Sequence, residues 1–463
     1  MGEKTSIEHS KLNMASYGFG KFLTEFMEMA FTVWLYFFYV VTIGVDSLII
    51  GLAVVIYAIW NAVNDPLVGY LTNRPFKFTR KWGRRFPWIM IGGFAYILSY
   101  ILIFYPPNVD PHSGAWIYFI WFLFSTAIFD TFNSIFFVNF ASLFPDKFRS
   151  VDERRKATGI QTPIGIVGVA LGAILPPMII TDKLNASLFV VNAGLIIIIG
   201  IVVLTLAIPG CREDQVTINS YLAKHDREDR TPFFKTLRTT LKQKSFLFFI
   251  ITYTLYRSLV ISFQASIPFY TEFVLAEDVQ TLLSAGFLVG ALISSPIWAY
   301  LAQKTNNNKK IMLTNSFLLT IFTIPFTLVN SVIIAMIAVI LWGFGLGGFW
   351  TMLAPTFGDV IDESVVNSQK RQEGVFNGFL QFFGRIAILV QAISFATVHT
   401  LTGFVEGGTL GEQPSSAIWG VHVHFALLPA IFMLLSTLIF WRFYDLTPEK
   451  VRLNQEKIIE LNL

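Results

Sequence analysis

Charged residues are scarce in this 463-residue chain. Asp, Glu, Lys and Arg make up 14% of it, against 54% hydrophobic residues and a mean hydropathy of +0.60. So little charge does not cover the surface of a soluble protein. The single cysteine, Cys211, excludes an internal disulfide and any cysteine-based metal set. A phosphate-binding G-x-x-x-x-G-K-[ST] loop is also lacking, as is any grouping of a nucleophile with a base, so neither ATP drive nor an enzyme is expected.

Long apolar runs are what the chain has instead. Residues 189–209 (FVVNAGLIIIIGIVVLTLAIP) contain no charge, and a helix of about 20 residues crosses a hydrocarbon core of roughly 30 Å. A membrane barrel would show alternating segments of about ten residues, which these runs are not. The sequence therefore predicts an all-α membrane protein with twelve transmembrane helices. We expect these near residues 14–44, 46–72, 87–105, 115–143, 157–181, 188–209, 245–275, 280–303, 309–329, 331–358, 373–403 and 417–444.

Basic residues fall in alternate loops. They follow the second, fourth, sixth and eighth predicted spans, whereas Lys183 is the only one in the odd-numbered loops. The positive-inside bias then predicts a multi-pass protein of the cell membrane with both termini in the cytoplasm. Since orientation accounts for the basic loops, we expect no nucleic-acid partner.

One long hydrophilic stretch divides the predicted spans six and six. We expect a six-helix bundle at 1–210, a cytoplasmic middle loop at 211–244, a second six-helix bundle at 245–444 and a cytoplasmic tail at 445–463. PLVGYLTNR at 66–74 has an echo in PIWAYLAQK, displaced by 230 residues. Parallel six-helix repeats are the plan of the major facilitator fold, in which substrate binds between the two bundles.

Ionisable residues inside spans cost roughly 2.5 to 3.5 kcal/mol each on insertion scales, so each is a candidate for function. On the first span, Lys21, Glu25 and Glu28 share one helix face by their spacing. They form either a substrate-binding group or a local pair in which Lys21 neutralises a glutamate.

Two further spans carry polar groups at helical spacing. On the second span, Asn61 and Asp65 are four residues apart, with Asn64 adjacent. Their oxygens suit a hard cation, and a buried carboxylate alternatively takes a proton. The alternative is that Asp65 caps the next loop or pairs with its arginines. The fourth span carries Asp130, Asn133, Ser134 and Asn139, roughly on one side.

Several motifs resemble one transporter family. YGFGKFLTEF (17–26), NAVNDPLVGYLTNR (61–74), WGRRFPWIMIGG (82–93) and GDVIDESVVNSQKRQEG (358–374) followed by Arg385 are similar to motifs of the glycoside-pentoside-hexuronide:cation symporters, a branch of the major facilitator superfamily. The resemblance extends through nearly all twelve spans. It implies symport by alternating access, with a cation moving together with a sugar or glycoside.

The resemblance implies a cation site. The positions that match the family's ligands are Asn61, Asn64 and Asp65 on the second span and Ser134 on the fourth. Asn61 stands where the family has a second carboxylate, which leaves one formal negative charge and favours a proton over sodium. The coupling ion is thus H⁺ or Na⁺, and no other cofactor is expected.

The resemblance also implies substrate contacts at Glu25, Trp350 and Arg385. The family's sugar-binding aspartate falls at Phe137, and its fifth-span arginine falls at Ile160 or Gln161. Asp130, seven residues before Phe137, lies on nearly the same face and offers another acceptor. The predicted substrate-binding residues are Glu25, Lys21, Asp130, Asn133, Gln161, Trp350 and Arg385. The alternatives are an anionic sugar held by cationic side chains, or a lysophospholipid or other amphipathic molecule.

Charged residues at the predicted cytoplasmic ends match the family's salt-bridge network. Such pairs close one side of the carrier and break when it opens; without the resemblance they would be solvated loop charges. The predicted gating residues are Glu153, Arg154, Asp359, Asp362, Arg371 and Glu373. We expect the protein to work as a monomer in the lipid bilayer on a small-molecule substrate.

Overall fold

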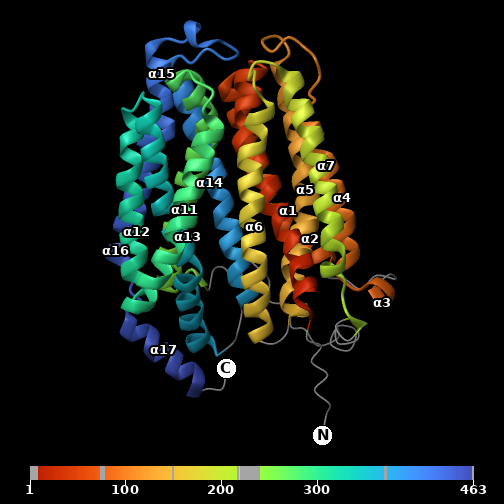
Figure 1. Ribbon diagram of the computed structural model, residues 1–463, viewed down its shortest axis with the longest axis vertical. Helices are drawn as coiled ribbons and strands as arrows, with labels where there is room; N and C mark the ends of the chain where they lie inside the picture. The colour runs from red at the N-terminus through yellow and green to blue at the C-terminus, as the bar shows by residue number, and fades with distance from the viewer. Residues whose placement is uncertain are drawn as a thin grey trace. The chain divides into compact units, whose positions relative to one another are not determined.

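The structure is a computed structural model that describes residues 9–72, 79–148, 151–215, 218, 240–369 and 373–460. Within these ranges the regular secondary structure is helical throughout (Figure 1). The chain divides into two compact units, Met1–Arg230 (unit 1) and Thr231–Leu463 (unit 2). Arg371 lies outside the described residues, as does the side chain of Glu373.

Unit 1 is built from long helices joined by short connections. Its helices are α1 (Lys11–Phe37, continued by a π-helical turn at Phe38–Thr42), α2 (Ser47–Thr72), α3 (Thr79–Trp82), α4 (Phe86–Ile103), α5 (Ala115–Lys147), α6 (Val151–Ile179) and α7 (Ala186–Cys211).

Unit 2 has the same plan with one more helix after its bundle. Its helices are α10 (Lys244–Tyr270, with a π-helical turn at Thr271–Leu275), α11 (Gln280–Thr305), α12 (Asn308–Thr323, with a 3₁₀ turn at Ile324–Thr327), α13 (Val332–Ser368), α14 (Glu373–Thr402), α15 (Ser415–His422), α16 (Leu428–Phe443) and α17 (Pro448–Glu460). A π-helical turn at Val423–Leu427 joins α15 to α16, so that the two form one span.

The two units repeat one scheme of helix pairing. In unit 1, α1 packs on α6 and α7, α2 on α5, and α4 on α5 and α7. In unit 2, α10 packs on α14 and α16, α11 on α13, and α12 on α13 and α16. Each pair in one unit has its counterpart at the same place in the order of spans. The pair α2 and α5 therefore corresponds to α11 and α13.

Eleven helices among the described residues are long and apolar enough to cross a membrane. The remaining long helix, α1, carries Lys21, Glu25 and Glu28 along its length, which lowers its apolar character. It is nevertheless packed inside unit 1 against α6 and α7. The prediction of an all-α membrane protein is confirmed, and each of the twelve predicted spans contains an observed helix.

Side chains at helix starts explain where several spans begin. Ser10 accepts a hydrogen bond from the Asn13 N–H at the start of α1, and Asn185 accepts one from the Ser187 N–H at the start of α7. Asp46 accepts from two N–H groups of the first turn of α2. Such caps satisfy donors that a helix leaves unpaired.

The end of α13 lies well beyond its predicted position. The apolar window ends near residue 358, but the helix continues to Ser368 and ends at Gln369, whose φ of 54° is left-handed. Polarity changes along this segment without any residue that breaks a helix, so the backbone hydrogen bonds continue. The acidic residues Asp359 and Asp362, predicted at the end of this span, lie within α13.

Candidate functional site

Helices α2 and α5 carry a polar cluster where they pack together. Asn61 and Asp65 lie one helical turn apart on α2, and Asp130 and Ser134 lie one turn apart on α5. Both bonds that join these pairs, Asn61 to Asp130 and Asp65 to Ser134, connect residues 69 apart in sequence. The helices therefore run in the same direction, with their polar turns face to face.

Hydrogen bonds tie the cluster into one network. The Asn61 amide nitrogen donates to Asp130 Oδ1 over 2.6 Å, and the Asn64 amide nitrogen donates to Asp130 Oδ2 over 3.1 Å. Asn64 also lies 3.0 Å from the Ser134 hydroxyl oxygen, and that hydroxyl donates to Asp65. We call these five residues the α2–α5 cluster: Asn61, Asn64, Asp65, Asp130 and Ser134.

Four of the five residues of the cluster are buried, and Asp65 is partly exposed. Asn61 and Asp130 are each 1% exposed, and Ser134 is fully buried. Among the residues that the structure describes, none makes a hydrogen bond to the buried carbonyl oxygen of the Asn61 side chain. Turning this amide over would set that oxygen against the Asp130 carboxylate, so the observed hydrogen bonds fix its orientation. A buried oxygen of this kind is a ready ligand for a cation.

One expectation from the sequence is wrong. The replacement of a carboxylate by Asn61 was expected to leave a single negative charge, but Asp130 lies in hydrogen-bond contact with that very side chain. The cluster therefore contains two carboxylates. The signal for this was the four-residue spacing of Asp130 and Ser134, which matches the spacing of Asn61 and Asp65.

Other polar residues of α5 lie outside the α2–α5 cluster's hydrogen bonds. The Asn133 side-chain oxygen is buried and has no hydrogen-bond partner within the described ranges. Asn139 accepts a hydrogen bond from Arg85 over 3.2 Å. Arg84, which also lies in the connection between α2 and α4, pairs with Asp146 over 2.9 Å. These two arginines thus have carboxylate or amide partners near the end of α5.

On α1, Lys21 and Glu25 form the local pair that their spacing allows. Their charged atoms are 2.8 Å apart, and both side chains are partly exposed. The stem of Lys21 covers Gly165 on α6, where an added Cβ would lie 3.0 Å from Lys21 Cγ. Gln161 lies one turn before Gly165 and is partly buried. The structure thus groups these three predicted substrate residues on the α1–α6 pair, apart from the cluster's hydrogen bonds.

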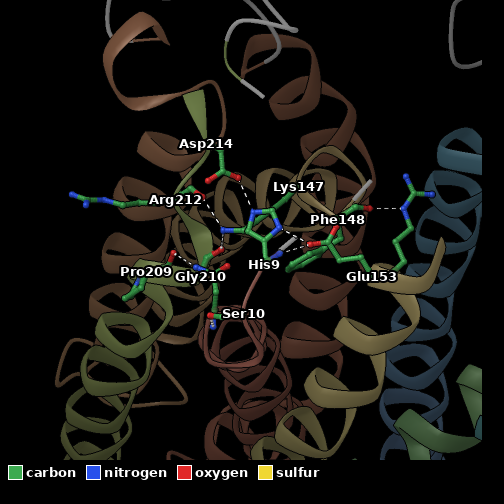
Figure 2. Close-up of polar contacts among 11 residues, drawn as sticks. His9, Ser10, Lys147, Phe148, Glu153, Pro209, Gly210, Arg212 and Asp214 are labelled. Atoms are coloured by element: carbon green, nitrogen blue, oxygen red, sulfur yellow. Dashed lines mark hydrogen bonds and ion pairs between the residues drawn. The ribbon is translucent and has the colours of Figure 1, made fainter. Parts of the chain in front are cut away.

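Glu153, a predicted gating residue, is bound within unit 1. It accepts hydrogen bonds from the His9 backbone N–H over 2.9 Å and lies 2.6 Å from His9 Nδ1 (Figure 2). His9 Nε2 lies 2.7 Å from Asp214, just after α7. A protonated imidazole carries a hydrogen on each nitrogen and so donates to both carboxylates. His9 and Glu153 are both buried, and sequence reasoning overlooked His9 because it lies in a polar terminal segment.

Lys147 strengthens the same end of unit 1. From the last turn of α5 it donates to the carbonyl oxygens of Gly210 and Arg212 at the end of α7, over 2.7 and 2.9 Å (Figure 2). A cation at a helix C-terminus satisfies orphan carbonyls and interacts favourably with the helix dipole. Arg154, another predicted gating residue, donates to the Phe148 carbonyl over 2.7 Å. We call His9, Lys147, Glu153 and Asp214 the His9 clasp.

Unit 2 holds the remaining predicted residues. Trp350 lies on α13 with 37% of its surface exposed, and Arg385 lies on α14 and is partly buried. Asp359 accepts a hydrogen bond from Asn308 over 2.8 Å. Glu363, which the sequence did not single out, accepts hydrogen bonds from Gln243 and Ser245 at the start of α10.

Comparisons with known proteins agree on one family. A family profile described as MFS/sugar transport protein matches residues 16–448. An uncharacterized symporter of Synechocystis is 24% identical, with 96% of each chain covered. The sodium-dependent lysophosphatidylcholine symporter 1 of Gallus gallus is 23% identical over 87% of this chain and 80% of its own. Among solved structures, a D-xylose-proton symporter superposes with a TM-score of 0.63 at 12% identity, covering 93% of this chain and 97% of its own.

Proposed function

The chain belongs to the MFS/sugar transport protein family, and from this premise we propose that it is a symporter that couples a cation to the uptake of a small molecule. It is a multi-pass membrane transporter of the major facilitator fold. The observation that supports coupling is the α2–α5 cluster, in which Asp65 lies with amide and hydroxyl groups inside apolar helices. A charged group in such a place is costly, and a bound cation or proton reduces the cost.

The proposed binding site for the coupling ion, H⁺ or Na⁺, consists of Asp65, Asn61, Asn64 and Ser134. Coupling requires that the ion and the substrate stabilise the same conformation of the carrier. Because Asp65 and Ser134 are on different helices, a small movement between α2 and α5 changes the distance between them. Ion affinity then depends on conformation, as symport demands.

For the substrate, we propose a sugar or glycoside. Lys21, Glu25 and Gln161 form one group on α1 and α6, partly exposed and able to donate and accept hydrogen bonds. Trp350 and Arg385 of unit 2 would supply a stacking surface and a cation. Asp130 and Asn133 were the other predicted substrate contacts. Proteins bind sugars through hydrogen-bond donors and acceptors together with an aromatic face, and these residue types supply both.

A second candidate is a lysophospholipid or another amphipathic molecule. Phe137 stands where the family has a sugar-binding carboxylate, and the chain contains 47 phenylalanines. The relative from Gallus gallus carries the name of a lysophosphatidylcholine symporter. An apolar substrate tail would pack against phenylalanine side chains and would not need the hydrogen bonds that a sugar makes.

We propose that both termini face the cytoplasm, because the basic loops favour this orientation. The His9 clasp then lies at the cytoplasmic end of unit 1, and Glu153 and Arg154 are proposed to gate from there. Asp359, Asp362, Arg371 and Glu373 are proposed to act at the corresponding end of unit 2. The protein would work as a monomer without a further cofactor.

Counterflow in proteoliposomes tests the transport proposal. Vesicles that contain purified protein are loaded with one sugar, glycoside or lysophospholipid at a time and diluted into labelled ligand. The main proposal is supported if a sugar or glycoside exchanges and if a sodium or pH gradient also drives its accumulation in the vesicles. Exchange of lysophospholipid alone would support the second proposal. If no ligand of either class exchanges under any gradient, the proposal fails.

A further inference from the structure

Asp130 occupies a position that the sequence assigned to substrate, yet its contacts are with the cation site. Both of its carboxylate oxygens accept hydrogen bonds from α2, one from Asn61 and one from Asn64. Asn61 stands where the resemblance expects a carboxylate, and the carboxylate lies instead across the helix pair, 2.6 Å from that amide. The second carboxylate that the resemblance places on α2 is thus supplied by α5 in this chain.

We infer that Asp130 is the second carboxylate of the cation site and that the site therefore takes Na⁺. This inference rests on the proposed function. The ligand set it assigns is all oxygen: the carboxylates of Asp65 and Asp130, the Ser134 hydroxyl and the side-chain carbonyl of Asn61.

The unpartnered Asn61 oxygen is the independent observation that points to a ligand. It is buried, receives no hydrogen bond from the part of the chain that the structure describes, and belongs to the same amide whose nitrogen bonds Asp130. Left without a partner, a buried oxygen of this kind is destabilising. A cation between the two helices gives the Asn61 oxygen a partner. A proton bound to either carboxylate has no need of that oxygen as a ligand.

The chemistry of the side chains also favours a metal cation. Among the hydrogen bonds described, two amides and a hydroxyl join Asp65 to Asp130. Oxygen sites with two carboxylates suit hard cations, and a single Na⁺ interacts with both carboxylates at once.

The arrangement predicts that the two residues are interchangeable as a pair. Asp130→Asn removes the second carboxylate, and the double variant Asn61→Asp with Asp130→Asn returns it to α2 with the same total charge and nearly the same volumes. The two side chains keep their mutual hydrogen bond with donor and acceptor reversed. A residue that binds substrate directly would not be rescued in this way.

The experiment titrates purified protein with NaCl at constant ionic strength, with choline chloride as the balancing salt, and follows thermal stability and tryptophan fluorescence. Wild type, Asp65→Asn, Asp130→Asn and the double variant are compared. Asp110→Asn is the matched control, because Asp110 lies in the connection between α4 and α5 and its carboxylate bonds Ser113 and the His112 N–H.

We expect wild type and the control to show a saturable response to sodium. Asp130→Asn should raise the half-saturating sodium concentration at least tenfold, the double variant should return it to within about threefold of wild type, and Asp65→Asn should abolish the response. If Asp130→Asn misfolds, the double variant still decides, because a wild-type-like sodium response requires the exchanged carboxylate to work.

Three results would overturn the inference, and they separate it from the proposed function. If Asp130→Asn binds sodium with wild-type affinity, Asp65 binds the cation without Asp130. The inference then fails, whereas the proposal of cation coupling stands. A double variant that folds but resembles Asp130→Asn shows that the two positions are not equivalent. If wild type shows no sodium response, the sodium site is refuted. The counterflow assay in proteoliposomes under a pH gradient then tests the transport proposal by itself.

Discussion

The α2–α5 pair of unit 1 and the α11–α13 pair of unit 2 occupy the same place in the two units but are held together differently. At a displacement of 230 residues, Asn61, Asn64 and Asp65 correspond to Ala291, Ser294 and Ser295. The serine hydroxyls of α11 donate to backbone carbonyls, that of Ala291 in their own helix and, from Ser295 at 3.5 Å, that of Gly347 in α13. The polar groups of α2 instead bond to side chains of α5.

Glycines take over the contact in unit 2. A Cβ at Gly290 would lie 2.1 Å from the Ile340 carbonyl oxygen, and one at Gly343 would lie 2.1 Å from the Phe287 carbonyl oxygen. Backbones that approach this closely form the small-residue packing common between membrane helices. One helix scheme thus supports two uses: close packing in unit 2, and a polar site in unit 1 where side chains rather than backbones meet.

The strongest test of this contrast is Asp65→Asn. The substitution keeps the shape of the side chain but removes its charge, so we expect ion-driven accumulation to fall at least 100-fold, about 2.7 kcal/mol of coupling. Exchange without a gradient should remain measurable. Uptake in proteoliposomes is compared with Ser295→Asn, the same final residue at the corresponding place in unit 2, which should accumulate normally. Normal accumulation by Asp65→Asn would move the coupling site elsewhere.

Gly343→Ala tests the packing half of the contrast. The added Cβ meets a backbone oxygen that has little freedom to move, so we expect a loss of about 1–3 kcal/mol of stability, seen as a lower thermal midpoint. Gly69→Ala on α2 is the control, because the nearest atom to its Cβ is Val138 Cγ1 at 3.7 Å. Both changes gain about 1 kcal/mol of helix propensity. Equal midpoints for the two variants would contradict close packing in unit 2.

His9→Phe tests whether polar contacts also hold the end of unit 1. Phenylalanine keeps a ring beside Phe148, which lies edge-on to His9 at 5.4 Å, but removes both nitrogen contacts. We expect a loss of roughly 1–2 kcal/mol, because the buried Glu153 carboxylate loses its hydrogen-bond partner on the His9 ring. Arg452→Ala, which removes an exposed pair with Glu456 on α17, should change the midpoint far less. An effect of His9→Phe no larger than that of Arg452→Ala would contradict a structural role for the clasp.

Ser134→Ala should have the smallest effect. It removes one hydroxyl that donates to Asp65 and leaves both carboxylates, so we expect sodium affinity to fall about fivefold, near 1 kcal/mol. Ser294→Ala, whose hydroxyl bonds only within α11 in the hydrogen bonds described, should leave sodium affinity unchanged. If the two variants have the same sodium affinity, the hydroxyl of Ser134 has no part in the site.

The spans were predictable from the sequence because hydrophobicity alone selects them. Their ends were less so: the apolar window stops near 358, but α13 continues to Ser368, since helical hydrogen bonding does not depend on hydropathy. Helix α17 was missed within the predicted tail for the same reason, because its composition is polar.

The cluster was half predictable. Spacing along α2 places Asn61 and Asp65 on one face, and the same rule places Asp130 beside Ser134 on α5. Which faces meet depends on how α2 and α5 pair, and sequence spacing does not contain that information. Asp130 was therefore assigned to the substrate, although its hydrogen bonds are with α2.

Direct binding of radioactive sodium to the purified protein tests the central claim. The account predicts saturable binding near one ion per chain, absent in Asp65→Asn. Binding that is the same in Asp65→Asn as in wild type, or no saturable binding in wild type at any pH, would contradict a sodium site between α2 and α5.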